Sequence, residues 1–311
     1  MGWSRALLVP HVVRLGLRAP REVSTRWDRY WAGVRATGDG GDVLWDSSRP
    51  DEARRYLDLL GAHADPRLPV IDLGCGNGRL TRALATRYPR ALGVDLSPAA
   101  IARAEHETID HQDHPDRPGD PDPTSDPDPT SDPAGPGVGG VGAAGPEFRA
   151  ADMTVDGVGG RLAAELGDAN VFIRGVLHVL DAPARRRLAT NVHSLVGTTG
   201  TVLVAETNYP GPPLGYLESL GAGPRGLPHP LARAVASGLP RPQPFGVAEL
   251  EDCFSPARWD RVLVDDHAEI TAIPMQRANV PESIPALVAV LRPRGLPASL
   301  HRSARTHPAL S

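Results

Sequence analysis

The stretch that decides the fold is "VIDLGCGNGRL", Val70–Leu80, in which three glycines stand at alternate positions directly after an apolar run. The run has the length and the branched apolar residues of a buried strand, and Leu80, Ala83 and Leu84 then recur at helical spacing. A glycine-rich turn between a strand and a helix lets a ligand lie against bare backbone. The segment therefore predicts a binding site for a nucleotide-like ligand.

Segments of strand type and helix type alternate on both sides of this turn. A strand is expected at residues 91–96, and Ser97 and Pro98 then begin a helix that runs to about Thr108. Two adjacent strands are expected to pair antiparallel late in the chain, at residues 258–266 and 269–277. The other expected strands lie within residues 147–152, 169–176 and 197–207, and the other expected helices within 80–88 and 185–196. This order predicts a mostly parallel sheet with helices on both faces, whose ligands bind beyond the carboxyl ends of the strands.

The composition is that of a globular protein without membrane-spanning segments. Apolar residues make up 41% of the 311 residues, and no apolar run is long enough to cross a bilayer. His11 and Arg14 interrupt the apolar start of the chain, so residues 1–20 are expected to form a helical arm, with peripheral membrane contact as the alternative. Cys75 and Cys253 form no disulfide framework, which favours a reducing cytoplasm and no structural metal site.

The basic residues exclude several kinds of chemistry. All 33 of them are arginine. A P-loop that binds phosphate through lysine is therefore excluded, and so is a Schiff base between a lysine and a carbonyl compound. The arginines are scattered along the chain and do not interleave with aromatic residues in one patch, so no nucleic-acid partner is expected.

One long segment, Asp110–Gly145, has the composition of a disordered surface insertion. It repeats the unit "PDPTSD" in tandem and contains almost no apolar residue that a core could bury. Proline at this density is incompatible with helix and sheet. The segment also accounts for the chain's net charge of −4, because eight aspartates and one arginine stand between Asp110 and Asp132, and without them the formal charge would be about +3. The overall acidity therefore says little about partners.

The spacing of the glycines discriminates between classes of ligand. A dinucleotide fingerprint counted from Gly74 requires a glycine at position 79, where this chain has Arg79. The segment instead has the form acid-x-G-x-G-x-G, beginning at Asp72, which resembles motif I of the class I S-adenosylmethionine-dependent methyltransferases. The resemblance implies S-adenosylmethionine as the cofactor and a Rossmann-like α/β fold. In this fold a mostly parallel seven-stranded sheet ends in an antiparallel hairpin and carries helices on both faces.

Further segments follow in the order that the resemblance requires, from Asp51 to Glu206. Asp95, in "GVDLS", is placed where an acid accepts hydrogen bonds from both ribose hydroxyls, and Asp152, in "AADMT", resembles the residue that bonds the adenine amino group. The segment "VFIRGVLHVL" resembles the stretch that lines the methyl-transfer site. The residues expected to contact the cofactor are Asp72, Gly74, Cys75, Gly76, Gly78, Asp95, Leu96, Asp152, Met153 and Arg174.

Several of these residues have a second, structural interpretation. Asp72 could cap the turn and Asp95 could be an exposed strand end, while Cys75 is expected to be a small buried residue and not a nucleophile. His178 is a candidate general base, because imidazole titrates near neutral pH. The alternative is that its apolar neighbours bury it as a structural residue.

Two stretches outside the core are candidates for the wall that selects the methyl acceptor. In the N-terminal arm or lid, residues 1–50, three aromatic residues share one helical face, and Trp45 follows. A second insertion, residues 208–245, is rich in proline and glycine. The candidate acceptor residues are Trp27, Tyr30, Trp31, Trp45, Tyr209 and Tyr216. The alternative is that the aromatic stripe packs its helix onto the methyltransferase domain, residues 51–311.

The sequence thus favours a cytoplasmic methyltransferase that acts on a small molecule of specialised metabolism, with no nucleic-acid partner and no integral membrane association. Two other hypotheses stay open. The acceptor could be a peptide or protein, or the domain could bind the cofactor without transferring methyl.

Overall fold

The computed structural model of the protein describes residues 20–46, 50–113, 145–223, 226–272 and 282–295. Within these ranges seven strands form one sheet in the order β3-β2-β1-β4-β5-β7-β6. Five strands run parallel: β1 (Val70–Leu73), β2 (Ala91–Asp95), β3 (Glu147–Ala150), β4 (Asn170–Arg174) and β5 (Val202–Thr207). The last two, β6 (Trp259–Ala272) and β7 (Glu282–Pro293), pair antiparallel, and β7 is also antiparallel to β5. The predicted sheet, parallel with an antiparallel end, is confirmed.

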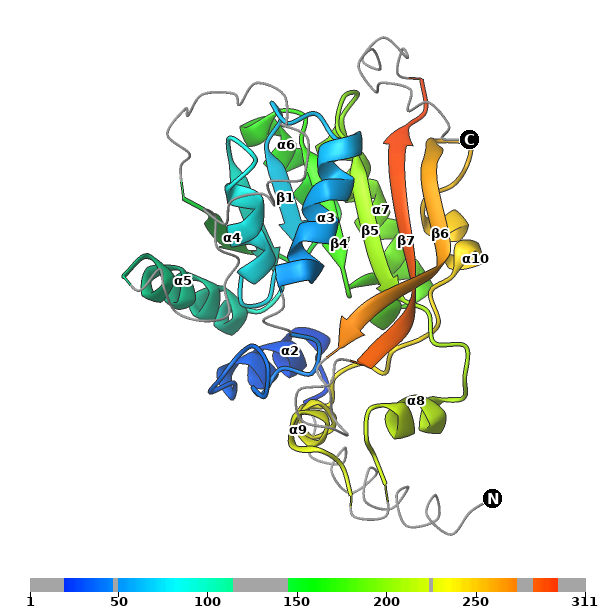
Figure 1. Ribbon diagram of the computed structural model, residues 1–311. Helices are drawn as coiled ribbons and strands as arrows, with labels where there is room; N and C mark the ends of the chain where they lie inside the picture. The colour runs from blue at the N-terminus through cyan, green and yellow to red at the C-terminus, as the bar shows by residue number, and fades with distance from the viewer. Residues whose placement is uncertain (1–19, 47–49, 114–144, 224–225, 273–281, 296–311) are drawn as a thin grey trace, which may run out of the picture.

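Helices cover both faces of the sheet, as Figure 1 shows. The helices α3 (Pro50–His63) and α4 (Arg79–Ala85) bury apolar side chains against one face, and α6 (Val158–Leu166), α7 (Ala182–Val196) and α10 (Val247–Cys253) cover the other. The strands are apolar on both sides for this reason: in β4, Val171 and Ile173 face one core, and Phe172, between them, faces the other.

A cap of helices lies beyond the carboxyl ends of the parallel strands. It comprises α2 (Val23–Ala32) with the segment 33–46 that packs against it, α8 (Pro213–Ser219) and α9 (His229–Ser237), and α5 (Pro98–Asp113) borders it (Figure 1). The two stretches that were expected to contribute to the acceptor wall meet here, because the Arg233 guanidinium of α9 donates to the carbonyl oxygens of Tyr30 and Gly33. Residues 1–19, nearly all of the segment 1–20 that was expected to form a helical arm, lie outside the described ranges. Within those ranges, no helix is both long enough and apolar enough to cross a membrane.

The predicted terminal hairpin is present, but its residues were assigned wrongly. Residues 258–266 and 269–277 were expected to be two strands, whereas Trp259–Ala272 is the single strand β6. The register with β7 shifts between Asp265 and Ala268, and the chain continues as one strand through this irregularity, where the two expected strands were divided. The true partner, β7, was missed.

The helix α5 also extends further than expected, through Asp113. Residues 110–113 contain no proline, and Pro115 is the first residue that disfavours continuation of the helix. The rest of the expected insertion, residues 114–144, lies outside the described ranges.

Phe172 supplies a test of this architecture. Its side chain is 1% exposed and stacks at a tilt on Tyr56 of α3, with ring centroids 5.2 Å apart. We expect Phe172→Ala to lower the free energy of unfolding by about 3–5 kcal/mol, because it removes a large buried ring and leaves a cavity. Urea unfolding measures this, and Val262→Ala on the partly exposed β6 should cost less than about 1 kcal/mol. Similar losses of unfolding free energy in both variants would contradict the assignment of Phe172 to the hydrophobic core.

Candidate active site

The turn after β1 is built from backbone that leaves no space for side chains. Gly74, Gly76 and Gly78 all have positive φ, at 76°, 56° and 75°. A Cβ atom on Gly74 would lie 2.3 Å from Cγ2 of Val176, and one on Gly76 would lie 2.8 Å from the Trp31 ring. Both the conformation and the close packing therefore require glycine at these two positions.

Two aspartates flank the turn at the ends of β1 and β2. Asp95 accepts hydrogen bonds from the backbone N–H groups of Gly76 (3.0 Å) and Ser97 (2.9 Å), so it ties the turn to the second strand. Asp72 is 4% exposed and accepts a hydrogen bond of 2.6 Å from the Thr81 hydroxyl. Burial, reinforced by the charge of Asp95, raises the pKa of Asp72 to about 6, and burial also raises the pKa of Asp95.

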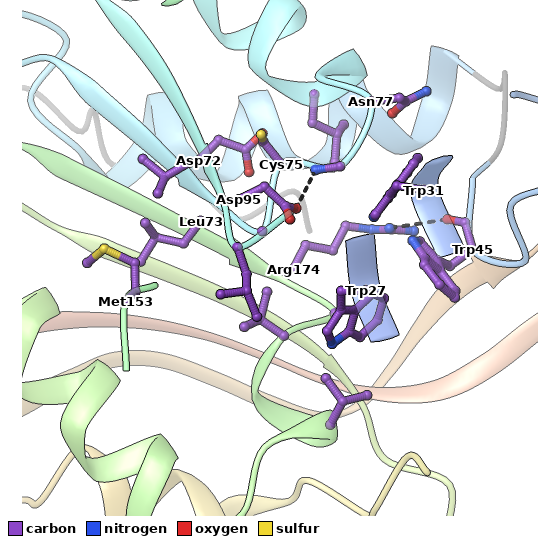
Figure 2. Close-up of a pocket in the computed structure, with 18 of the residues that line it drawn as sticks. Trp27, Trp31, Trp45, Asp72, Leu73, Cys75, Asn77, Asp95, Met153 and Arg174 are labelled. Carbon is purple, nitrogen blue, oxygen red and sulfur yellow. Dashed lines mark hydrogen bonds between the residues drawn. The ribbon is translucent and has the colours of Figure 1, made fainter. Parts of the chain in front are cut away.

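A cavity opens at this edge of the sheet between the turn and the cap (Figure 2). Nine of the ten residues expected to contact the cofactor line it: Asp72, Gly74, Cys75, Gly76, Asp95, Leu96, Asp152, Met153 and Arg174. Gly78 is not among the lining residues. It is the left-handed N-cap of α4, and a Cβ atom there would lie 2.6 Å from the Phe148 ring.

The expected acceptor residues divide into two groups. Trp27, Trp31 and Trp45 line the cavity from the cap side, with Arg174 reaching toward them (Figure 2). Tyr30 is fully buried, stacks on Trp45 with ring centroids 5.3 Å apart, and donates its hydroxyl to the Asp42 carbonyl at 3.2 Å. The rings of Tyr209 and Tyr216 contact each other, at 5.3 Å, and neither residue is among the lining residues.

His178 follows β4 in the short 3-10 turn η1 (Leu177–Val179) and is held by a carboxylate. Its Nδ1 lies 2.6 Å from Oε2 of Glu206, which is fully buried at the end of β5. The same carboxylate accepts the backbone N–H groups of Val176, Leu177 and His178. The His178 side chain is not among those that line the cavity, although Val176 and Val179 are. Its role as a general base stays a prediction.

A buried group of charged residues was missed by the sequence analysis. Arg79 Nε lies 3.2 Å from Asp46, and Arg79 Nη2 lies 3.1 Å from Glu52. The second oxygen of Glu52 accepts a hydrogen bond from Arg174. Burial disfavours the charged form of Arg174, but Glu52 and Tyr56 outweigh it and raise the pKa of the guanidinium. No motif connects residues 46, 52, 79 and 174, so the sequence carries no signal for this cluster.

A family model described as a methyltransferase domain matches residues 45–222. Trans-aconitate 2-methyltransferase of Streptomyces avermitilis is 41% identical over 70 residues, which cover 19% of this chain and 26% of that protein. Malonyl-[acyl-carrier protein] O-methyltransferase of Acetivibrio thermocellus is 39% identical over 54 residues, 17% of this chain and 19% of that protein. The chain thus spans about a quarter or less of the length of these two curated relatives.

A solved structure shares the fold over most of the chain. It is an S-adenosylmethionine-dependent methyltransferase of Anabaena variabilis, with a TM-score of 0.66 over 89% of this chain and 97% of that one. The sequence identity is 23%, so this likeness establishes the arrangement of the elements and not the acceptor.

Proposed function

We propose that this chain, which belongs to the methyltransferase domain family, is an S-adenosylmethionine-dependent methyltransferase whose acceptor is a small molecule of specialised metabolism. The observation that carries the proposal is the aromatic lining of the cavity. Trp27, Trp31 and Trp45 line it from the cap side, and the Trp31 ring packs directly on the glycine turn at Gly76. An aromatic wall this close to the turn suits a compact acceptor with apolar surface.

The residues around the turn fit S-adenosylmethionine. Asp95 would accept the ribose hydroxyls, and Asp72 would offer its negative charge to the ammonium group. Leu96 and Met153 supply apolar surface for a flat base, with Asp152 beside them as an acceptor for its amino group. The exposed backbone at Gly74 and Gly76 allows close approach of the ligand.

The protein's part in methyl transfer is to position the acceptor and to exclude water. When bound, the cofactor supplies a methyl group on a positively charged sulfur, which is already activated. The wall of Trp27, Trp31 and Trp45 shields the cavity from solvent and restricts the approach of the acceptor. A base is required only when the acceptor atom carries a proton that must leave.

The relatives support a small acceptor and also motivate the second candidate function. The name of the Streptomyces relative specifies trans-aconitate, whereas that of the Acetivibrio relative specifies a malonyl group carried by a protein. A third candidate, a domain that binds the cofactor without transferring methyl, has the same cavity.

One assay separates these candidates. The purified protein is incubated with methyl-labelled S-adenosylmethionine and either a small-metabolite fraction or a protein fraction of the source organism. Label in a small product supports the proposal, and label in the protein fraction alone would support a peptide or protein acceptor. Tight binding of S-adenosylhomocysteine by calorimetry, with no transfer to either fraction, would contradict methyl transfer.

Asp95 tests the assignment of the cofactor site. We expect Asp95→Ala to weaken binding of S-adenosylhomocysteine by about 1.5–3 kcal/mol, because charged hydrogen bonds to the ribose are lost. Isothermal titration calorimetry measures the change. Asp58→Ala, which removes a carboxylate paired with Arg87 at the surface, serves as the control and should leave affinity unchanged. An unaltered dissociation constant for Asp95→Ala would remove Asp95 from the site.

The raised pKa of Asp72 predicts that affinity depends on pH. With a pKa of about 6, Asp72 is mostly protonated at pH 5 in the free protein and cannot meet the ammonium group as an anion. Binding then requires loss of the proton, so affinity for S-adenosylhomocysteine should fall about tenfold from pH 7.5 to pH 5.

The contribution of Asp72 to the stability of the unliganded protein has the opposite trend. The pKa of Asp72 is higher in the folded state than in the unfolded state. Its contribution to stability is therefore present below about pH 4 and is lost as the pH rises through 6.

Titrations at several pH values measure the effect on affinity, with Asp72→Asn as the matched variant. This variant cannot ionise, so its affinity should be lower at pH 7.5 and nearly independent of pH. A wild-type profile that is flat between pH 5 and 7.5 would show that the ionised Asp72 does not contact the ligand.

His178 as a base is tested by His178→Asn, whose side-chain N–H group can still donate to Glu206. If imidazole takes a proton from the acceptor, turnover should fall roughly 10²–10⁴-fold while affinity for S-adenosylhomocysteine stays near wild type. Steady-state kinetics with the acceptor that the labelling assay identifies measure turnover, and calorimetry measures the affinity for S-adenosylhomocysteine. Thermal unfolding shows whether the variant is folded. Near wild-type turnover of the folded variant would make His178 a structural partner of Glu206.

A further inference from the structure

Four buried charged residues meet at the cavity and form what we call the Arg79 cluster: Asp46, Glu52, Arg79 and Arg174. Their side chains are between 4% and 10% exposed. They come from the cap, from α3, from the first turn of α4 and from the end of β4. Two positive and two negative charges balance within the cluster, and Glu52 joins the two guanidiniums, one through each carboxylate oxygen.

One donor in this cluster has no acceptor. Arg79 Nη1 is buried and makes no hydrogen bond within the described part of the chain. The nearby carboxylate of Asp46 is occupied, since one oxygen accepts Arg79 Nε and the other accepts the Gly38 N–H (2.7 Å) and the Asn77 amide (3.0 Å). All three nitrogens of Arg174 have partners. Leaving the N–H groups of a charged side chain unpaired in the interior is unfavourable, so a partner is expected for Arg79 Nη1.

The position of Arg79 indicates where that partner comes from. Arg79 lines the cavity, and it directly follows the glycine turn. Arg185 provides a contrast, because it is 5% exposed and its Nη2 also lacks a partner. It lies over the Phe245 ring at 5.1 Å, and it is not among the cavity-lining residues. Arg79 thus lines the cavity and carries a nitrogen without a partner in the described part of the chain, whereas Arg185 packs in a core contact away from the cavity lining.

We infer that the Arg79 cluster is a carboxylate-binding subsite of the cavity, in which Arg79 supplies the donor and Glu52 with Arg174 holds its guanidinium in place. A guanidinium is always charged and presents planar N–H groups that match the two oxygens of a carboxylate. The inference rests on the proposed function, because that function supplies two possible carboxylates. One belongs to the amino-acid end of the cofactor, and the other would belong to the methyl acceptor.

Removing the carboxylate from the ligand tests the first source directly. Calorimetry compares S-adenosylhomocysteine with its decarboxylated analogue, which keeps the amino group. We expect wild type to bind the intact compound roughly 10- to 100-fold more tightly. The Arg79→Lys variant should lose most of this preference for the intact compound. Lysine keeps the positive charge beside Asp46 and Glu52 but has no second guanidinium nitrogen that could donate to a carboxylate. The analogue itself should bind both proteins about equally.

Arg185→Lys is the matched control, since it also replaces a buried arginine with an unpaired nitrogen. It should retain the wild-type ratio, and thermal unfolding of both variants reports any loss of folding. If wild type binds S-adenosylhomocysteine and its decarboxylated analogue with about equal affinity, the carboxylate that the subsite binds belongs to the methyl acceptor. Arg79→Lys should then raise the acceptor KM about tenfold or more, with unchanged affinity for S-adenosylhomocysteine.

Three results would overturn the inference. The first is that Arg79→Lys changes neither the ligand ratio nor the KM. The second is that the variant weakens both ligands equally, which is the behaviour of a merely structural residue. The third needs no variant: a wild-type ratio near one, together with an acceptor that carries no carboxylate. The calorimetric comparison requires no acceptor. An absence of methyl transfer would therefore contradict the proposed function, but it would not show whether the subsite binds a carboxylate.

Discussion

The rest of the site depends on the backbone turn between β1 and α4 and on the hydrogen bond that fixes it, from the Gly76 N–H to Asp95. Each of the three glycines faces a side chain from a different part of the fold. Val176 after β4 packs on Gly74, Trp31 of the cap packs on Gly76, and Phe148 of β3 packs on Gly78. These glycines are therefore required by protein packing as well as by the approach of a ligand. A side chain on Gly74 or Gly76 would displace a residue that lines the cavity, Val176 or Trp31.

The same constraint explains how the cap is positioned. The Trp31 ring lies flush against the turn at Gly76, while Asp46 reaches from the cap to Arg79 on α4. An apolar contact and a buried ion pair are thus among the contacts that hold the cap. Burying charges is costly, and such clusters persist where their geometry matters more than their net contribution to stability. In this molecule the geometry places Arg79 and Arg174, at the end of β4, in the lining of the cavity, with Glu52 bonded to both guanidiniums.

The sequence predicted the parts of the fold that depend on local pattern. The strand–turn–helix at Val70 and the acids Asp72 and Asp95 follow from spacing, because the carboxyl ends of parallel strands share one edge. The long strand β6 was missed because a bulge lets polar residues continue a strand. Helical periodicity placed Tyr30 beside Trp27 and Trp31 but could not distinguish a buried ring from one that lines a cavity. The contacts of Arg79 with Asp46 and Glu52 join residues that are distant in sequence, and no period encodes them.

The chemistry of the acceptor connects His178 with the Arg79 cluster. Glu206 holds the imidazole through Nδ1, so Nε2 is the nitrogen left to exchange a proton. A hydroxyl or ammonium acceptor must lose a proton as it is methylated, and a base at this position would serve it. A carboxylate acceptor is already anionic, so it has no proton to lose when it is methylated. If the Arg79 cluster orients the carboxylate that is methylated, His178 has no proton to remove, and Glu206 then holds it only to shape the backbone from Gly175 to Val179 that borders the cavity.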